Sequence, residues 1–354
     1  MALTTGTGRR NSYPLRMTIL ANKTDLVRAG SGTWQDQMKW AIRDLRGLRD
    51  VLGLADEGGL QHAAEAEFPV FAPLPYLTRI TSGDSQDPLL RQIWPSGSEM
   101  ESPSHFSTDP LGESDATKSS GMLQKYQGRV LLVTTGACAI HCRYCFRRHF
   151  PYEQSPKSMA QWEPTLTKIA ADDSIDEVIL SGGDPLTIVD HSLSRLIARI
   201  DEIAHIKRIR FHTRLPIMIP QRVTDAFLEI LANSRCQMIV VIHANHANEL
   251  DSSVEQALSK IANSGAMLLN QAVLLRGVND SLESLKNLSQ RLLRCRVLPY
   301  YLHQLDPVSG AAHFEVDVKQ GLQLVTELRS CLPGYAVPRY VQELRGEPNK
   351  TVLA

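Results

Sequence analysis

The sequence predicts an α/β fold in which a parallel sheet of six strands curves into a partial barrel, preceded by an N-terminal, mainly helical extension. From residue 129 onward, apolar runs of strand length alternate with amphipathic helical segments, which is the pattern of consecutive βα units. Six such units are too few for a closed eight-stranded barrel, so we expect an open one. We assign residues 1–120 to the extension and residues 121–354 to the barrel with its C-terminal segment.

The six apolar runs are rich in aliphatic and β-branched residues, and each has the length of a buried strand. They are Arg129–Thr135, Glu177–Ser181, Arg208–His212, Gln237–His243, Ala266–Leu274 and Val297–Leu302. A helix is predicted over Arg222–Asn233, because apolar residues recur there every three or four positions. Another helix with the same spacing follows a predicted N-cap at Asp190.

The extension contains one helical pattern and one polar segment. Apolar residues in Trp34–Leu54 recur at roughly helical spacing with charged residues between them, which predicts a helix. The segment Ser96–Ser120 is rich in Ser, Asp and Gly. We therefore expect it to be a loop or a covering arm rather than a core element.

Composition limits the classes of function. The 354 residues carry 38 Lys and Arg against 38 Asp and Glu, so the formal net charge is zero. This balance gives no electrostatic reason to expect a nucleic acid or an anionic membrane as a partner. No segment approaches the roughly 20 apolar residues needed to span a bilayer. Residues Met1–Arg16 are basic but lack the apolar core of a secretory signal, so we expect a cytoplasmic protein.

The strongest chemical signal is a C-x3-C-x2-C group formed by Cys138, Cys142 and Cys145, directly after the first predicted strand. Three thiolates can bind three irons of a 4Fe–4S cluster and leave the fourth iron open for another ligand. His141 and His149 are close enough in sequence to complete a zinc site instead, although structural zinc sites usually use two separated ligand pairs. A disulfide is the least expected alternative, because no secretory signal is recognised and the cysteines are so closely spaced.

Polar residues follow several of the predicted strands. Residues 181–185 read S-G-G-D-P, where paired glycines would let the backbone approach a ligand closely and Asp184 adds a hydrogen-bond acceptor. Alone, this sequence is also that of an ordinary turn. His243, Gln271 and His303 occur at or near later strand ends. Because the carboxyl ends of parallel strands meet at one mouth, we expect these residues to form one site.

The cysteine spacing, with the aromatic Tyr144 before the third cysteine, resembles the signature of the radical S-adenosylmethionine (SAM) enzymes. Longer segments resemble the lysine 2,3-aminomutases of that superfamily, in order along residues 121–354. They are K-Y-Q-G-R-V at 125–130, S-G-G-D-P-L at 181–186, N-Q-A-V-L-L-R-G-V-N-D at 270–280 and G-Y-A-V-P at 334–338. In the N-terminal third, residues 87–92 and 106–111 are most similar to bacterial members of the family that serve β-lysylation of elongation factor P. The resemblance implies a partial (β/α)6 barrel of the radical SAM type.

The resemblance also implies three cofactors, each with its own residues. The 4Fe–4S cluster would be bound by the three cysteines. Pyridoxal 5′-phosphate (PLP) would be bound through Lys350 and contacted by Lys125, Arg129 and Gln271. SAM would be contacted by Ser181, Gly182, Gly183, Asp184 and His243.

For the substrate, the resemblance implies that Arg147 binds the α-carboxylate and that Asp306 and Glu343 bind the side-chain ammonium. A guanidinium suits the first role because it can donate two parallel hydrogen bonds to a carboxylate. Glu343 and Lys125 replace an aspartate and an arginine of the clostridial members, which changes the geometry expected at both positions. Two carboxylates disfavour glutamate as the substrate, because they would repel its side chain.

The activity implied is that of an isomerase, an intramolecular aminotransferase that converts L-lysine into β-lysine, with the R isomer expected. The product would modify elongation factor P through a lysyl-transferring ligase, and a reductant such as flavodoxin or ferredoxin would supply electrons. Two alternatives stay open: a catabolic aminomutase acting on lysine or another amino acid, and a non-catalytic iron–sulfur or zinc module. The sequence leaves the oligomeric state open, a homo-oligomer included.

Overall fold

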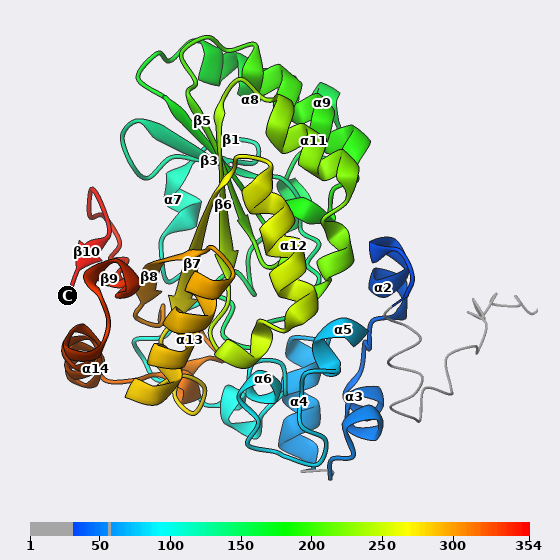
Figure 1. The fold of residues 1–354 in the computed structure, drawn as a ribbon, viewed down its shortest axis with the longest axis vertical. Helices are drawn as coiled ribbons and strands as arrows, with labels where there is room; N and C mark the ends of the chain where they lie inside the picture. The colour runs from blue at the N-terminus through cyan, green and yellow to red at the C-terminus, as the bar shows by residue number, and fades with distance from the viewer. Residues whose placement is uncertain (1–30, 56–57) are drawn as a thin grey trace, which may run out of the picture.

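The computed structural model describes residues 31–55 and 58–354, which form a curved sheet of ten strands in the order β1 to β10 (Figure 1). The basic segment Met1–Arg16 lies outside these described residues. Six successive parallel strands make up the centre of the sheet. They are β3 (Arg129–Val133), β4 (Glu177–Ser181), β5 (Arg208–Thr213), β6 (Gln237–His243), β7 (Met267–Val273) and β8 (Leu298–His303). All six predicted strands are therefore confirmed, with ends that differ by two residues at most.

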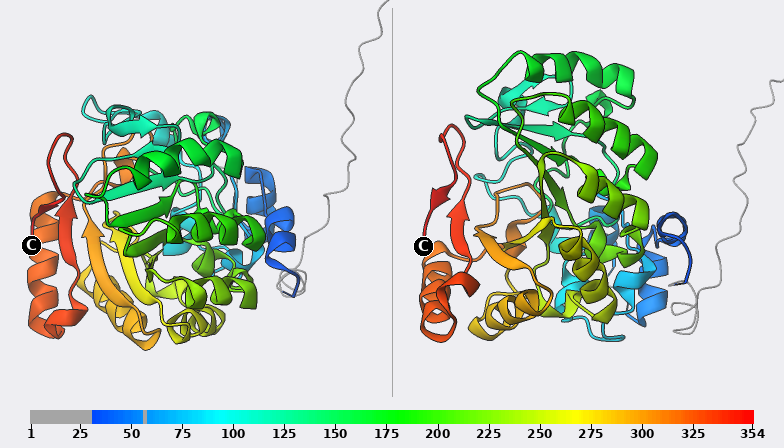
Figure 2. Two further views of the ribbon diagram at one scale, coloured as in Figure 1. Left: turned by 90° about the horizontal axis from the view of Figure 1, so that it is seen from above. Right: turned by 45° about the horizontal axis from the view of Figure 1, so that its top comes forward.

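Short strands extend this sheet on both sides. β9 (Arg339–Gln342) pairs in parallel with β8, and β10 (Thr351–Val352) pairs antiparallel with β9. On the other side, β2 (Met122–Leu123) and β1 (Thr117–Ser119) add antiparallel to β3. The strand order runs from β1 to β10 without closing, and Figure 2 shows the curved sheet with helices along its outer side. The predicted partial barrel is confirmed.

Six longer helices alternate with the strands and cover the outer face of the sheet. They are α8 (Met159–Ala170), α9 (Asp190–Asp201), α11 (Asp225–Asn233), α12 (Ser252–Asn263), α13 (Leu282–Arg294) and α14 (Val318–Cys331). Their apolar faces are buried; in α13, for example, Leu285, Leu288 and Leu292 pack into the core. The hydroxyl of Ser281 caps this helix by accepting a hydrogen bond from the Ser284 N–H.

Two predicted helix starts were wrong. The helix expected from Arg222 begins at Asp225 as α11, because Thr224 takes the N-cap position and its hydroxyl accepts a hydrogen bond from the Phe227 N–H. Asp190 is the first residue of α9 and not its N-cap. Its carboxylate instead pairs with Arg222 at 2.7 Å and accepts a hydrogen bond from the Thr224 hydroxyl. The Asp190 side chain thus contacts a neighbouring segment of the chain and does not cap its own helix.

The extension is helical, as predicted, and packs against one end of the barrel (Figure 1). The single helix expected over Trp34–Leu54 is divided into α2 (Trp34–Trp40) and α3 (Leu45–Leu52). The chain breaks there because Ile42 exchanges two backbone hydrogen bonds with Ala72, at 2.8 and 2.9 Å. Further helical elements of the extension are α4 (Gly59–Glu67), α5 (Leu74–Leu77), α6 (Pro88–Arg91) and a 3-10 turn at Gly97–Met100.

Apolar side chains of the extension, including Leu48, Leu74 and Leu77, belong to the same hydrophobic core as the barrel strands. The polar segment Ser96–Ser120 contacts the barrel, where the Ser107 N–H donates to the Pro307 carbonyl at 2.9 Å, but it is not only a loop or arm because it contains α7 (Glu113–Ala116) and strand β1 of the sheet. Two of its carboxylates, Glu99 and Glu113, are buried, which sequence did not predict. Within the described residues, no helix is both long and apolar enough to cross a membrane.

Candidate active site

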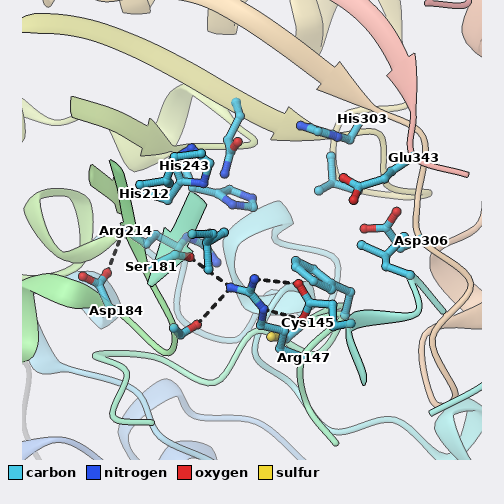
Figure 3. Close-up of a pocket in the computed structure, with 18 of the residues that line it drawn as sticks. Cys145, Arg147, Ser181, Asp184, His212, Arg214, His243, His303, Asp306 and Glu343 are labelled. Atoms are coloured by element: carbon cyan, nitrogen blue, oxygen red, sulfur yellow. Dashed lines mark hydrogen bonds and ion pairs between the residues drawn. The ribbon is translucent and has the colours of Figure 1, made fainter. Parts of the chain in front are cut away.

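A cavity of about 660 Å³ lies at the inner face of the curved sheet, towards the carboxyl ends of the parallel strands (Figure 3). All the residues that sequence predicts for the site line this one cavity. They are Lys125, Arg129, Cys138, Cys142, Cys145, Arg147, Ser181, Gly182, Gly183, Asp184, His243, Gln271, Asp306, Glu343 and Lys350. Residues separated by more than 200 positions therefore meet, as expected for a barrel whose strand ends point to one mouth.

The three cysteines lie on the loop after β3 and are free thiols that face the cavity. Burial raises the pKa of Cys138 well above its usual value and that of Cys145 to about 12, so both prefer the neutral thiol when no cation is bound. A bound metal centre would reverse this preference, because it deprotonates its cysteine ligands. The donor set is therefore suited to an iron–sulfur cluster, which binds one cysteine at each of three irons and so spreads its ligands around a bulky group.

The two histidines beside the cysteines contact other parts of the protein. His141 stacks on Phe68 with 5.0 Å between ring centroids, and its Nδ1 lies 2.7 Å from the Pro69 carbonyl oxygen. His149 Nε2 lies 3.3 Å from the Ser309 carbonyl oxygen. Across the described part of the chain, no three His, Cys, Asp or Glu side chains are arranged to hold a single metal ion.

The extension holds the cysteine loop in place. Arg143, between the second and third cysteines, is fully buried and donates hydrogen bonds to both oxygens of Glu99, at 2.8 and 2.6 Å. Arg148 adds a second ion pair to the same carboxylate at 3.0 Å. The side chains in these pairs are at most 1% exposed, so water screens them little. Glu99 has no signature in the local sequence, because its partners lie more than 40 residues away.

The Gly-Gly-Asp segment after β4 fits tightly against the cysteine loop. A Cβ atom at Gly182 or Gly183 would collide with the carbonyl oxygens of Thr135 or Ala137, and Gly182 has a φ of 128°. The glycines thus allow close approach of the protein's own backbone, whereas sequence predicted the approach of a ligand. The Gly183 N–H donates to the Thr135 carbonyl at 2.7 Å.

Asp184 lines the cavity, but its carboxylate is already hydrogen-bonded on both oxygens. Oδ1 accepts from the Leu186 N–H and the Thr213 hydroxyl, and Oδ2 accepts from the N–H groups of Arg214 and Leu215, at 2.7 to 3.0 Å. Burial is the main effect on this group and raises its pKa despite these donors. Asp184 therefore joins the loop after β4 to the loop after β5.

Arg147 reaches the cavity already paired with a carboxylate that sequence did not predict. Its Nε and Nη2 each donate to one oxygen of Glu113 at 2.7 Å, and its Nη1 donates to the Ser181 hydroxyl at 2.9 Å. Burial opposes the charge of Arg147, but Glu113 outweighs burial and raises the pKa of the guanidinium. Such a two-point pair is geometrically specific, and it orients Arg147 towards β4.

Glu343, directly after β9, lies between two lysines. Its Oε1 accepts from Lys125 Nζ at 2.9 Å, and its Oε2 pairs with Lys350 Nζ. Burial acts to raise the pKa of Glu343, but Lys350 and then Lys125 outweigh it and lower the pKa to about 2. Asp306, in the loop after β8, differs: among the described residues, none donates a hydrogen bond to its carboxylate. Burial, with Glu343 as the next cause, raises the pKa of Asp306 to about 7.

Arg129 is a cation on the cavity wall whose guanidinium lies over the Tyr126 ring, 4.7 Å from its centroid. In the ranges 31–55 and 58–354, no carboxylate lies within ion-pair distance of it. Arg129 and Lys350 line the same cavity, and one supplies a cation for a phosphate while the other supplies an amine. These two groups suit PLP.

Three histidines on the cavity wall are polar but uncharged (Figure 3). Burial lowers the pKa of His243 and of His303 to about 3, and it lowers that of His212 well below its usual value. His212 was not predicted for the site, although a signal for it exists. In β5, Arg208, Arg210 and His212 alternate with the buried Ile209 and Phe211, which places the three polar residues on one face of the strand.

The fold and the cysteine loop define the class of protein. Residues 132–289 match the model of the radical SAM superfamily, so the chain belongs to enzymes that use a 4Fe–4S cluster with SAM. The chain is 45% identical over 322 residues to the L-lysine 2,3-aminomutase of Haemophilus influenzae, covering 91% of this chain and 95% of that protein. It is 44% identical over 322 residues to the L-lysine 2,3-aminomutase of Escherichia coli, with 90% and 94% covered.

A third relative is more distant. The L-lysine 2,3-aminomutase of Clostridium subterminale is 32% identical over 330 residues, which cover 92% of this chain and 79% of that protein. The chain therefore belongs to the lysine 2,3-aminomutase family of radical SAM enzymes. The predicted family, and the prediction of an isomerase rather than a non-catalytic module, are confirmed.

Proposed function

We propose that this enzyme converts L-lysine into β-lysine with PLP bound through Lys350, and that the β-lysine is destined for elongation factor P. The observation that carries the proposal is the content of one cavity. It is lined by three free cysteines, an amine at Lys350, the acidic residues Asp306 and Glu343, and a cation at Arg129 that has no carboxylate partner among the described residues. These groups support one cavity that takes each cofactor and a cationic amino acid.

Each cofactor would occupy its own part of the cavity. The cysteines would hold the cluster, and SAM would lie between its open iron, the Ser181–Asp184 segment and His243. PLP would be held through Lys350, with its phosphate at Arg129 and further contacts from Lys125 and Gln271. When bound, the cluster and SAM supply a carbon-centred radical, and PLP supplies a conjugated ring that stabilises an unpaired electron during amino-group migration. The protein binds and orients these groups and excludes water.

Charge at the two ends of the cavity favours lysine over other amino acids. Arg147 and Ser181 form one end, where a substrate carboxylate would take over guanidinium donors that Glu113 and Ser181 occupy in the ligand-free protein. Asp306 and Glu343 define the acidic end; because Glu343 already pairs with Lys125 and Lys350, Asp306 is the carboxylate left for an ammonium. The raised pKa of Asp306 reflects burial without a cationic partner at close range, and an incoming ammonium would favour its ionised form.

Product analysis tests the reaction. Anaerobically reconstituted enzyme, supplied with SAM, PLP and a low-potential reductant such as flavodoxin or ferredoxin, should convert L-lysine to β-lysine. L-Glutamate and L-alanine serve as comparison substrates, because the first carries the wrong side-chain charge and the second has none. Equal conversion of glutamate and lysine would refute the assignment of the acidic end.

The link to elongation factor P is supported by the likeness of residues 87–92 and 106–111 to family members that serve this modification. Deleting the gene should leave the factor without its β-lysyl group, and added β-lysine should restore the modification through the lysyl-transferring ligase. A fully modified factor in the deletion strain would assign the enzyme to another pathway that uses β-lysine.

A further inference from the structure

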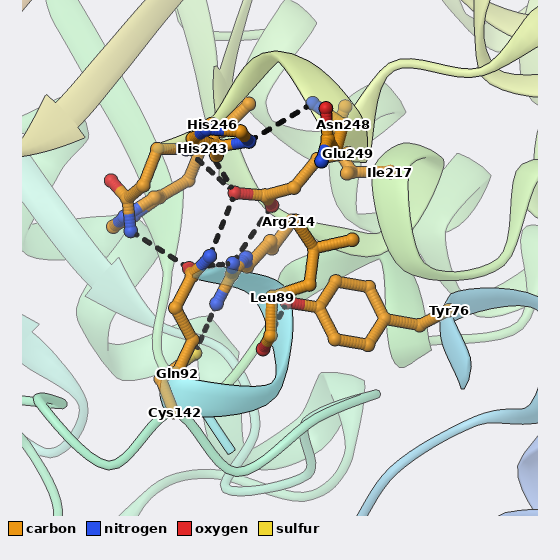
Figure 4. Close-up of polar contacts among 12 residues, drawn as sticks. Tyr76, Leu89, Gln92, Cys142, Arg214, Ile217, His243, His246, Asn248 and Glu249 are labelled. Carbon is orange, nitrogen blue, oxygen red and sulfur yellow. Dashed lines mark hydrogen bonds and ion pairs between the residues drawn. The ribbon is translucent and has the colours of Figure 1, made fainter. Parts of the chain in front are cut away.

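A buried arginine that takes no part in the proposed substrate contacts lies against one of the cluster cysteines. Arg214 follows β5, and its Nη1 is 2.7 Å from Cys142 Sγ (Figure 4). In the described part of the chain, it is the only side chain that donates a hydrogen bond to any of the three cysteine sulfurs. The neighbouring arginines 143 and 148 are directed to Glu99 instead.

Arg214 is held from several directions, so its contact with the sulfur is not an accident of a flexible side chain. Its Nη2 donates to Glu249 Oε2 at 2.8 Å and to Gln92 Oε1 at 2.6 Å. Its backbone N–H donates to Asp184 at 2.7 Å. The side chain of Arg214 is 8% exposed and that of Glu249 is 0% exposed.

The carboxylate that balances Arg214 is itself fixed by the backbone. Glu249 Oε1 accepts hydrogen bonds from the N–H groups of Asn245 and His246, at 2.8 and 3.0 Å. Gln92 Nε2 donates to the same oxygen at 3.2 Å. Nη2 of the guanidinium is therefore held by two fixed acceptors, which directs Nη1 to the sulfur, while Nε has no hydrogen-bond partner among the described residues.

We propose that Arg214 is a positioning residue that sets the reduction potential of the cluster through its hydrogen bond to Cys142. Reduction adds one electron from a low-potential one-electron donor to the cluster, and no proton needs to move. The added negative charge spreads over the cluster sulfurs, and a charged N–H donor to one of them stabilises the reduced form. Loss of Arg214 would also leave Glu249 as an unbalanced anion nearby, which disfavours reduction as well. The inference depends on the radical SAM class and not on the proposed substrate.

The test measures the potential and not the activity. Wild type and Arg214→Gln are reconstituted anaerobically with iron and sulfide, without PLP, SAM or lysine, and iron content is determined. EPR-monitored redox potentiometry then gives the midpoint potential. Glutamine is too short to reach the sulfur, so we expect the ratio of reduced to oxidised cluster at a fixed poise to fall about tenfold, a shift of about 59 mV to lower potential for a one-electron couple.

Two further variants make the result specific. Arg214→Lys keeps the charge on a slightly shorter side chain and should recover part of the shift. Arg79→Gln is a matched control: Arg79 is a buried arginine that pairs with Asp251 at 3.1 Å and donates to the Glu249 carbonyl, but it does not contact a cysteine. A fully iron-loaded Arg214→Gln variant with the wild-type potential would overturn the proposal, as would an equal shift in Arg79→Gln. Failure of both Arg214 variants to load iron would also overturn it, since the contact would then serve cluster assembly.

Discussion

Asp306→Asn is expected to make the ligand-free protein more stable while it removes lysine turnover. Burial, reinforced by Glu343, raises the pKa of Asp306 from 3.8 to about 7. The folded protein then keeps a proton that the unfolded chain releases. Stability conferred by this group is therefore present in full below about pH 4 and is lost as the pH rises to about 7. At about 1.4 kcal/mol per pKa unit, the cost above pH 7 is at most about 4 kcal/mol. Asparagine is nearly the same size as aspartate but does not ionise, so the variant does not pay this cost.

Denaturant unfolding of ligand-free protein at pH 5 and at pH 8.5 measures the effect. The advantage of Asp306→Asn over wild type should be larger at pH 8.5, whereas Asp173→Asn, an exposed surface control, should follow the wild type at both values. The same variant should lose lysine conversion with normal iron and PLP content, because the acidic end of the cavity has lost a charge. A difference in stability that does not change with pH would refute the reasoning, and so would unimpaired turnover. Residues that serve ligands commonly cost stability in this way.

Three further predictions concern the cofactors and the extension. Replacing Cys138, Cys142 or Cys145 with alanine should remove most of the iron and all cleavage of SAM, while Cys331→Ala, which changes a cysteine distant in sequence, should keep both by iron analysis and product assay. Borohydride reduction of PLP-loaded protein followed by peptide mapping should label Lys350, and label on Lys125 would contradict the assignment. Glu113→Gln should lower the free energy of unfolding by about 3–5 kcal/mol, because Arg147 loses a buried partner. Glu163→Gln, whose pair with Arg199 is about 40% exposed, should cost less than about 1 kcal/mol, and equal costs would argue against burial as the cause.

The central strands were predictable from sequence because each is a run of apolar residues that is buried in the sheet. The short outer strands were not predicted, since β1 and β10 are three and two residues long and contain polar side chains. Their pairing depends on neighbouring strands that are far away in the sequence. The helix predicted over Trp34–Leu54 is divided for a similar reason. Ile42 pairs with Ala72, which is far away in the sequence.

The residues that line the site could be assembled from the cysteine motif, the strand ends and family resemblance, but their partners could not. Glu113 pairs with Arg147 across 34 positions, and Glu249 pairs with Arg214 across 35. No local spacing marks such pairs, and the polar segment that contains Glu113 has the composition of a loop. For Gly182 and Gly183 the motif itself is visible in the sequence. The reason that glycine is needed there, close contact with the backbone of the cysteine loop, is visible only in the structure.

The extension supplies partners for the arginines that surround the cysteine loop. Its role therefore goes beyond covering the barrel. Four arginines surround the loop, and each is paired with a residue of the extension: Arg143 and Arg148 with Glu99, Arg147 with Glu113, and Arg214 with Gln92. Without residues 31–120, three of these guanidinium groups would lose their only carboxylate partners among the described residues, and Arg214 would keep Glu249 alone. A buried charge without a partner costs several kcal/mol, so the barrel residues 121–354 are not expected to form a stable cysteine loop by themselves. We therefore expect the extension and the barrel to fold as one unit.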